Sequence, residues 1–168
     1  MKFTKNLNSL SESEFTSIFG SVFEKSKWIS IETFKQKPFK DRDDLIEKMV
    51  KIYNTCSREK VIEIFNLHPK LAIEKKLTGF SSKEQNEAQL DKCTKEELLE
   101  FDNLNSNYKK KFKFPFIIAV KGKNKNDILQ SFRTRIDNDF ETEFNEAKIQ
   151  VMNIALLRLK EILNKILK

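Results

Sequence analysis

Apolar residues recur at helical spacing from the beginning of the chain. Ser11 and Glu14 have the spacing of a capping box, which marks the start of a helix. Behind them one stripe at positions i, i+3, i+4, i+7 and i+8 is formed by Phe15, Ile18, Phe19, Val22 and Phe23. A second stripe follows the acidic stretch DRDD and is formed by Leu45, Ile46, Met49, Ile52 and Tyr53. Each stripe predicts an amphipathic helix with one buried face.

A third apolar pattern is shorter and ends at a histidine. Ser57 can cap this helix, which carries Val61, Ile62, Ile64 and Phe65. Pro69 restricts the preceding residue to extended geometry, so His68, the only histidine of the chain, should occupy a helix boundary.

Further helix signals follow in the second half of the chain. Capping-box spacing recurs at Ser81 with Glu84 and at Thr94 with Glu97. Asn126 is a candidate cap for another helix, and a long helix is expected from about Phe140 onward. Between these helices, FKFPFIIAVKGK breaks the helical pattern, because its proline and β-branched run favour a buried extended segment.

These patterns predict an all-α fold. We expect a single domain over residues 1–168, built as a bundle of about seven to eight helices with one extended segment near Phe114 to Val120. The chain has only three Gly and three Pro, which leaves few places for the tight turns of an all-β fold. Hydrophobic residues make up 39% and charged residues 34%, as in an ordinary folded domain.

The chain carries a net charge of +7, which raises the question of an anionic partner. The stretch KKKFKF (109–114) interleaves lysine with phenylalanine, and KGKNK (121–125) adds further lysines, as in nucleic-acid-binding surfaces. Phe112, Phe114 and Phe116 are, however, predicted core residues, so the lysines around them are better explained as a solvated face. A non-catalytic basic helical module that binds nucleic acid or a protein partner is therefore the alternative reading, and nucleic-acid binding is not expected.

Metal, disulfide and membrane chemistry find little support in the sequence. Cys56 and Cys93 fit no metal or redox spacing, and with a single histidine we expect no metal site and two reduced thiols. The N-terminus lacks the apolar core of a secretory signal, and the longest apolar run, FPFIIAV, is too short to cross a bilayer. We expect a cytoplasmic protein with no membrane association.

One charged residue falls on the wrong face of the last helix. On a helical wheel the core-facing cluster consists of Phe140, Phe144, Ala147, Val151, Ile154, Ala155 and Ile162, and Arg158 lies in its middle. A guanidinium cannot lose its charge, so it needs an anionic partner that either the protein or a ligand supplies. Both readings remain open: an internal ion pair or snorkelling side chain, or a ligand anchor.

The roles of His68 and Glu84 also allow two interpretations. A histidine at a helix end is commonly a capping or packing residue, but its titration near neutral pH also suits general acid or base catalysis. Glu84 at the third position of a capping box would be structural, whereas a helix start can also hold a ligand oxygen.

Five stretches in order and in spacing resemble one enzyme family, the 2-oxo-4-hydroxy-4-carboxy-5-ureidoimidazoline (OHCU) decarboxylases. They are HPKLA (68–72), SSKEQNEAQL (81–90), LNSNYKKKFKFPFIIAV (104–120), RIDNDFETE (135–143) and IALLRL (154–159). The stretch KWISIETFKQKPFKDRDDL (27–45) is similar to the early part of the family. The resemblance spans nearly the whole chain.

The resemblance implies an all-helical, typically homodimeric enzyme without a cofactor. Its substrate is a small anionic ureidoimidazoline, OHCU, the product of 5-hydroxyisourate hydrolysis, which it decarboxylates to (S)-allantoin during urate breakdown. His68 corresponds to the catalytic histidine of the family, Glu84 to its functionally important carboxylate and Arg158 to its substrate-holding arginine. The remaining positions implied to bind substrate are Pro69, Ser81, Ser82, Lys83, Gln85, Phe116, Ile117, Ile118, Ala119 and Val120.

The chain departs from the family pattern at several turns. Lys113 stands where the family usually has glycine before the FPF segment, and NEAQL replaces a glycine-rich tail after the Glu-Gln pair. Lys70 stands where an acidic residue commonly follows the His-Pro pair, which alters the local field on His68. These differences bear on the shape of the pocket more than on its chemistry.

Overall fold

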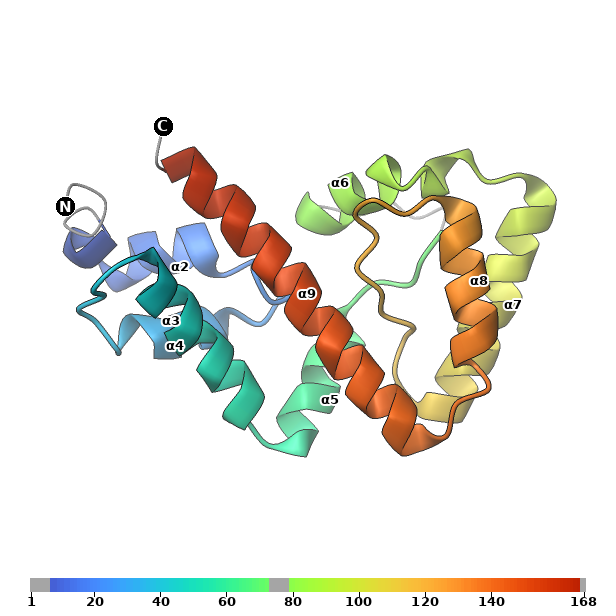
Figure 1. The fold of residues 1–168 in the computed structure, drawn as a ribbon, viewed down its shortest axis with the longest axis horizontal. Coiled ribbons are helices and arrows are strands. Elements are labelled where there is room, and N and C mark those ends of the chain that lie inside the picture. The colour runs from blue at the N-terminus through green and yellow to red at the C-terminus, as the bar shows by residue number, and fades with distance from the viewer. Residues whose placement is uncertain (1–6, 73–78, 167–168) are drawn as a thin grey trace. The chain divides into compact units, whose positions relative to one another are not determined.

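The computed structural model describes residues 7–72 and 79–166, and their secondary structure is entirely helical (Figure 1). No strand occurs within these two ranges, which confirms the all-α prediction. The elements are α2 (Glu12–Phe19), α3 (Lys27–Phe34), α4 (Arg42–Thr55), α5 (Arg58–Leu67), α6 (Gly79–Glu87), the 3-10 helix η1 (Leu90–Lys92), α7 (Lys95–Phe112), α8 (Lys125–Arg135) and α9 (Phe140–Ile166). Residues 115–120 lie outside every helix, at the place where the sequence predicted an extended segment.

The chain forms two compact units. The first consists of Met1–Leu67 and Met152–Lys168, and the second of His68–Val151. Helix α9 contributes residues to both units, since the boundary falls between Val151 and Met152.

The core of the first unit is built from aromatic residues of α2 and the loop before α4. Phe15 contacts Phe19 at a ring-centroid distance of 4.6 Å and stacks on Phe39 at 5.7 Å. Asn8 holds the backbone of Phe39 from both sides, accepting from its N–H at 2.8 Å and donating to its carbonyl at 2.9 Å. Helix α3 packs against both α2 and α4.

The core of the second unit surrounds Tyr108 on α7. Its ring contacts those of Phe112, Phe114, Phe116 and Phe132 at centroid distances between 4.5 and 6.0 Å. Helix α8, which carries Phe132, packs beside α7. The aromatic residues of the KKKFKFPF stretch are thus core residues, as predicted: Phe112, Phe114 and Phe116 are each at most 1% exposed.

Several predicted helix starts are confirmed. The Ser11 and Thr94 hydroxyls accept from the backbone N–H groups of Glu14 and Glu97, and both glutamates return the bond, so both capping boxes form. Asp41, within the acidic stretch DRDD, caps α4. Helix α5 starts directly after Ser57, and its last residue is Leu67, as the proline at 69 required.

Three predicted boundaries are wrong. Helix α2 ends at Phe19 rather than Phe23, and Gly20 follows as its C-cap, with its N–H donating to the Thr16 carbonyl. Val22 and Phe23 are nevertheless buried, at 1% and 2% exposure, so the stripe predicted the core correctly.

The other two errors concern caps in the second unit. Helix α6 begins at Gly79, whose φ of 62° turns the chain into the helix, so Ser81 lies inside α6 and is not its cap. Helix α8 is capped by Asn124 and not by Asn126; the Asn124 side chain accepts from the backbone N–H groups of Asn126 and Asp127.

Lys113 adopts the left-handed conformation that ends α7. Its φ is 65°, and its N–H donates to the Lys109 carbonyl. A left-handed residue with a Cβ costs roughly 1–2 kcal/mol, a cost that glycine does not incur. Glycine loses more backbone entropy on folding, which offsets part of this gain. The net effect of Lys113→Gly should be a rise of about 1 kcal/mol in the free energy of unfolding, measured by urea titration.

Lys110 provides the matched control, because it is an exposed lysine three residues earlier within the same helix. Lys110→Gly should lower the free energy of unfolding by about 1 kcal/mol, since glycine is a poor helix former. Two variants that both destabilise the protein would contradict the role assigned to the left-handed turn.

Candidate functional site

His68 lies at the helix boundary that the sequence predicted. Helix α5 ends at Leu67, and His68 and Pro69 begin the second unit. The imidazole side chain is buried, with the residue 9% exposed, whereas the preceding Leu67 is 39% exposed. The only histidine is therefore inside the protein and not on its surface.

The backbone that follows His68 and Pro69 is held by two buried amide side chains. Gln85 of α6 accepts from the Ala72 N–H at 3.1 Å and donates to the Lys70 carbonyl at 3.1 Å. Asn105 of α7 donates to the Leu71 carbonyl at 3.0 Å. Three consecutive residues are thus fixed, and Ala72 is kept at a φ of 51° that alanine rarely adopts. Helix α6, which carries Glu84, is thereby tied to the segment that carries His68.

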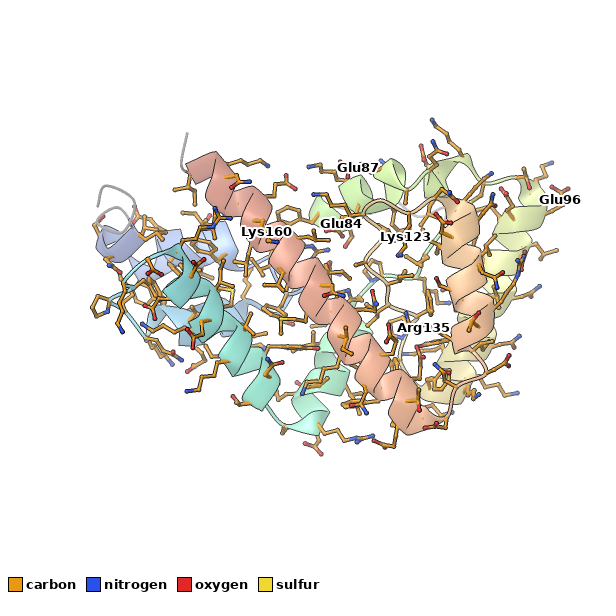
Figure 2. All side chains as sticks on the ribbon, viewed as in Figure 1. Glu84, Glu87, Glu96, Lys123, Arg135 and Lys160 are labelled. Atoms are coloured by element: carbon orange, nitrogen blue, oxygen red, sulfur yellow. The ribbon has the colours of Figure 1, made fainter. Side chains whose placement is uncertain are left out.

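Helix α6 contains all five residues from 81 to 85 that the resemblance implied. Ser81 and Gln85 are buried, Ser82 and Glu84 are half-buried, and Lys83 is exposed. Figure 2 shows Glu84 and Glu87 on this helix. Since α6 starts at Gly79, Glu84 is not the third residue of a capping box, so the structural reading offered for it does not apply.

The segment from Phe116 to Val120 is also buried. Phe116, Ile117, Ile118 and Val120 are between 1% and 7% exposed, and Ala119 is half-buried. Its backbone is held at two points, because Arg135 donates to the Ile117 carbonyl at 2.8 Å and the Ala119 N–H donates to Gln150 at 2.9 Å. Sequence reasoning gave neither Arg135 nor Gln150 a role.

Arg158 points into the first unit and is only 2% exposed, as the helical wheel predicted. Its Nη1 lies 3.0 Å from the Glu24 carboxylate and also donates to the Ser21 carbonyl at 3.3 Å. The internal ion pair that we considered for this arginine is therefore present. Glu24 could not be identified from sequence, because it lies 134 residues away and no pattern links the two positions.

The predicted site residues are divided between the two units. His68, Pro69, the α6 residues and the segment from Phe116 to Val120 belong to the second unit, where Gln85 joins α6 to the His68 segment. Arg158 belongs to the first unit, where its partner is Glu24.

Lys109 of α7 is influenced by a charge next to the His68 segment. Burial is the main cause that lowers the pKa of Lys109 below its ordinary value, and the Lys70 ammonium, directly after Pro69, adds a smaller repulsion.

No metal centre emerges from residues 7–72 and 79–166. Within these ranges, no three His, Cys, Asp or Glu side chains come together as metal ligands would. None of the helices described in these ranges combines the length and the apolar character needed to span a membrane.

The chain matches an enzyme family over most of its length. The family model described as OHCU decarboxylase matches residues 8–160 of the chain. A 2-oxo-4-hydroxy-4-carboxy-5-ureidoimidazoline decarboxylase from Haloferax volcanii is 34% identical over 157 residues, and the match covers 94% of both chains. The chain belongs to the OHCU decarboxylase family.

Two further relatives are longer than this chain. A uric acid degradation bifunctional protein from Bacillus sp. (strain TB-90) is 39% identical over 158 residues, which cover 94% of this chain and 32% of that protein. The chain thus spans about a third of that relative's length. The crystal structure of an (S)-allantoin synthase matches with a TM-score of 0.76 and 28% identity, over 95% of this chain and 53% of the other.

Proposed function

We propose that this chain decarboxylates OHCU to (S)-allantoin in the breakdown of urate, without a cofactor. The observation that carries the proposal is the buried His68, whose segment is tied by the side-chain amide of Gln85 to the helix of Glu84. Family membership over residues 8–160 supports the same activity.

The chemistry of the substrate suits these residues. In OHCU the carboxylate is attached to a carbon next to a C=N bond, so the electron pair released with CO₂ has an adjacent acceptor within the substrate itself. A proton must then move at the hydroxyl group or the ring. We assign this transfer to His68, and acid or base catalysis of this kind typically contributes about 10² to 10⁴ in rate.

Glu84 is assigned to orienting the substrate through its hydroxyl or ureido group. Its place on α6, beside Gln85, fixes it with respect to the His68 segment. Lys70, directly after Pro69, adds a positive charge to this segment, which favours an anionic substrate. Pro69, Ser81, Ser82, Lys83 and Gln85 complete the contacts that we propose in this part of the chain.

The main chain of Phe116 to Val120 is assigned to the ureide groups of the substrate. Among the described residues, the N–H and C=O of Ile118 take part in no hydrogen bond, although the residue is only 6% exposed. A buried peptide group needs a partner, and a ligand dense in amides can supply both a donor and an acceptor.

A coupled assay tests the proposal. OHCU is generated from urate with urate oxidase and 5-hydroxyisourate hydrolase, and its loss is followed by ultraviolet absorbance and circular dichroism. We expect this protein to accelerate the loss and to yield optically active (S)-allantoin. Spontaneous decay with racemic product, unchanged by the protein, would overturn the proposal.

We further propose a homodimer located in the cytoplasm, as the family resemblance implies. Sedimentation velocity at micromolar concentration should give about twice the mass of the 19.9 kDa chain.

Arg158 is proposed to anchor polar oxygens of the substrate. Hydrogen bonds to charged groups are worth about 1.5–3 kcal/mol, so Arg158→Met should raise the KM for OHCU about tenfold or more and change kcat less. The measurement is a full set of initial rates at varied OHCU concentration, with urea titrations of each variant in parallel.

Glu24→Gln is the matched control, because it removes the ion pair and keeps both Arg158 and an oxygen acceptor at position 24. This variant should keep the KM within about threefold of the wild type while losing about 1–3 kcal/mol of unfolding free energy. An unchanged KM in Arg158→Met, with only the stability reduced, would leave Arg158 a purely structural residue.

A further inference from the structure

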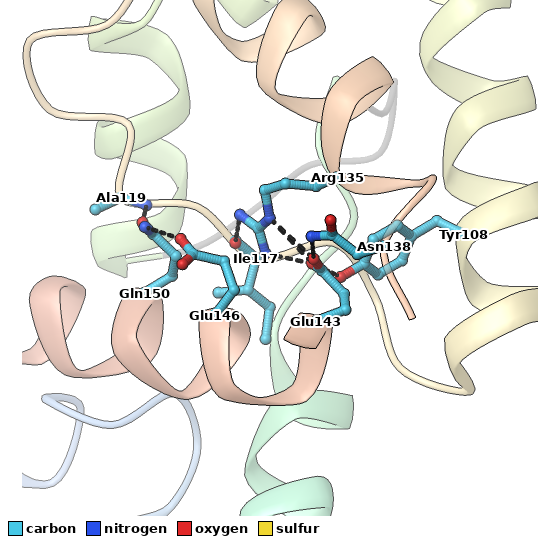
Figure 3. A network of polar contacts seen from close by, with 8 residues as sticks. All are labelled: Tyr108, Ile117, Ala119, Arg135, Asn138, Glu143, Glu146 and Gln150. Carbon is cyan, nitrogen blue, oxygen red and sulfur yellow. Dashed lines mark hydrogen bonds and ion pairs between the residues drawn. The ribbon is translucent and has the colours of Figure 1, made fainter. Parts of the chain in front are cut away.

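The motif RIDNDFETE has no role in the proposed chemistry, yet its two end residues form a buried ion pair. Arg135 donates to Glu143 from Nη2 at 2.5 Å and from Nε at 3.0 Å, and Glu143 is fully buried. The Tyr108 hydroxyl and the Asn138 amide, the latter at 2.9 Å, donate to the same carboxylate (Figure 3). A buried carboxylate with this many donors holds the guanidinium in one orientation.

Tyr108 is a permanent donor in this group. Burial, and then the Glu143 carboxylate, raise the pKa of its hydroxyl above the ordinary value. The hydroxyl therefore stays protonated at physiological pH and donates its hydrogen bond to Glu143.

From this pair Arg135 reaches two neighbouring residues of the segment from Phe116 to Val120. Its Nη1 donates to the Ile117 carbonyl at 2.8 Å, and its guanidinium lies over the Phe116 ring, 4.4 Å from the centroid. Phe132 stacks on the same Phe116 ring at 3.9 Å. Arg135 thus fixes both a backbone carbonyl and the adjacent side chain.

A second contact holds the segment from α9. The Gln150 side-chain oxygen accepts from the Ala119 N–H at 2.9 Å, while its NH₂ group donates to Glu146 at 2.8 Å (Figure 3). Because Glu146 accepts only from the NH₂ end of the amide, it fixes which end of Gln150 faces Ala119.

The two contacts hold the peptide groups on either side of Ile118. The Ile117 carbonyl shares a planar trans peptide group with the Ile118 N–H, and the Ala119 N–H shares one with the Ile118 carbonyl, so in each group the two point in opposite directions. Neither of these two groups of Ile118 takes a hydrogen bond within the described ranges. Arg135 and Gln150 therefore determine the direction in which Ile118 presents its peptide groups.

We propose that Arg135 and Gln150 are positioning residues of the decarboxylation, which hold the Ile118 main chain in a fixed orientation toward the substrate. This role rests on the proposed function, and through it the RIDNDFETE motif contributes to the decarboxylation. Donors and acceptors that are already oriented before the substrate binds need no reorganisation during the reaction.

Gln150 offers the cleaner test, because it is half-buried and carries no charge. Gln150→Leu removes the acceptor for the Ala119 N–H and should raise the KM for OHCU about tenfold, with the melting temperature changed by only about 2–3 °C. Amide hydrogen exchange at Ala119 should become faster. A purely structural role would lower the folded fraction and leave the KM of the folded enzyme unchanged.

An exchanged pair supplies the rescue. In Gln150→Glu combined with Glu146→Gln, residue 150 again offers an oxygen to Ala119 and residue 146 an amide, so both hydrogen bonds can form at unchanged net charge. We expect the KM to return to within about threefold of the wild type and the exchange at Ala119 to slow again. A wild-type KM in Gln150→Leu, or no recovery in the exchanged pair, overturns the inference.

Failure of the proposed function would look different. In that case the wild-type protein itself would not accelerate OHCU loss. The amide exchange of Ala119 and Ile118 in Gln150→Leu would still decide whether the side chain orders this segment, because that measurement requires no substrate.

Discussion

His68→Ala should lower kcat for OHCU decarboxylation by about 10² to 10⁴, the usual contribution of a positioned acid or base. The loss should fall on kcat because the proton moves in the transition state rather than in the bound ground state. His68 is the first residue after α5 and belongs to no helix. Removing its side chain should therefore lower the free energy of unfolding by less than about 2 kcal/mol. Initial rates and urea titrations on the same preparations measure both quantities.

Two further measurements separate catalysis from packing. Added imidazole should restore part of the activity of His68→Ala, because a soluble base can occupy the space that the side chain leaves. Leu67→Ala changes the neighbouring residue, which is 39% exposed, and should leave kcat near the wild-type value. Full activity in His68→Ala would remove the histidine from the mechanism, and equal losses in both variants would point to a damaged fold.

Much of the helical architecture could be predicted from periodicity and caps. The boxes at Ser11 and Thr94 and the helix end before Pro69 depend on neighbouring residues alone, so local sequence was sufficient. One error came where a backbone conformation decided the boundary. Gly79 turns the chain into α6 at a φ of 62°, and the capping-box spacing at Ser81 gave no sign of it.

The candidate site was predicted less completely than the fold. The wheel correctly placed Arg158 inside, but its partner Glu24 is one of many acidic residues and is distant in sequence. Gln85 shows the same limit. The hydrogen bonds of its side-chain amide to the backbone of Lys70 and Ala72 could not be predicted, because they depend on tertiary packing.

Buried polar groups in general escape sequence reasoning, because their burial depends on tertiary packing. Glu143 lies in the first turn of α9 with Glu141, and both suit the helix dipole there. Only the structure shows that Glu143 is fully buried. The available signal was the RIDNDFETE stretch itself, in which the arginine and the glutamate stand eight residues apart.

Glu143→Leu should lower the free energy of unfolding by about 3–5 kcal/mol, because it leaves the buried Arg135 guanidinium without its counter-charge. Arginine cannot relieve this by losing its proton. Tyr108→Phe removes one donor to the same carboxylate and leaves the ion pair, so it should cost only about 1 kcal/mol. Urea titrations of the two variants give the comparison, and similar losses would contradict the central place of the ion pair.

The double variant Arg135→Met with Glu143→Leu separates folding from positioning. Replacing a whole buried pair by apolar residues commonly restores stability, so the double variant should be more stable than Glu143→Leu alone. It nevertheless lacks the donor to the Ile117 carbonyl, and its KM for OHCU should stay raised. Recovery of both stability and KM would show that the pair serves only the fold. Recovery of stability alone would show that Arg135 and Glu143 have a second role besides stabilising the second unit. The pair would then also orient the backbone of Phe116 to Val120 toward the substrate.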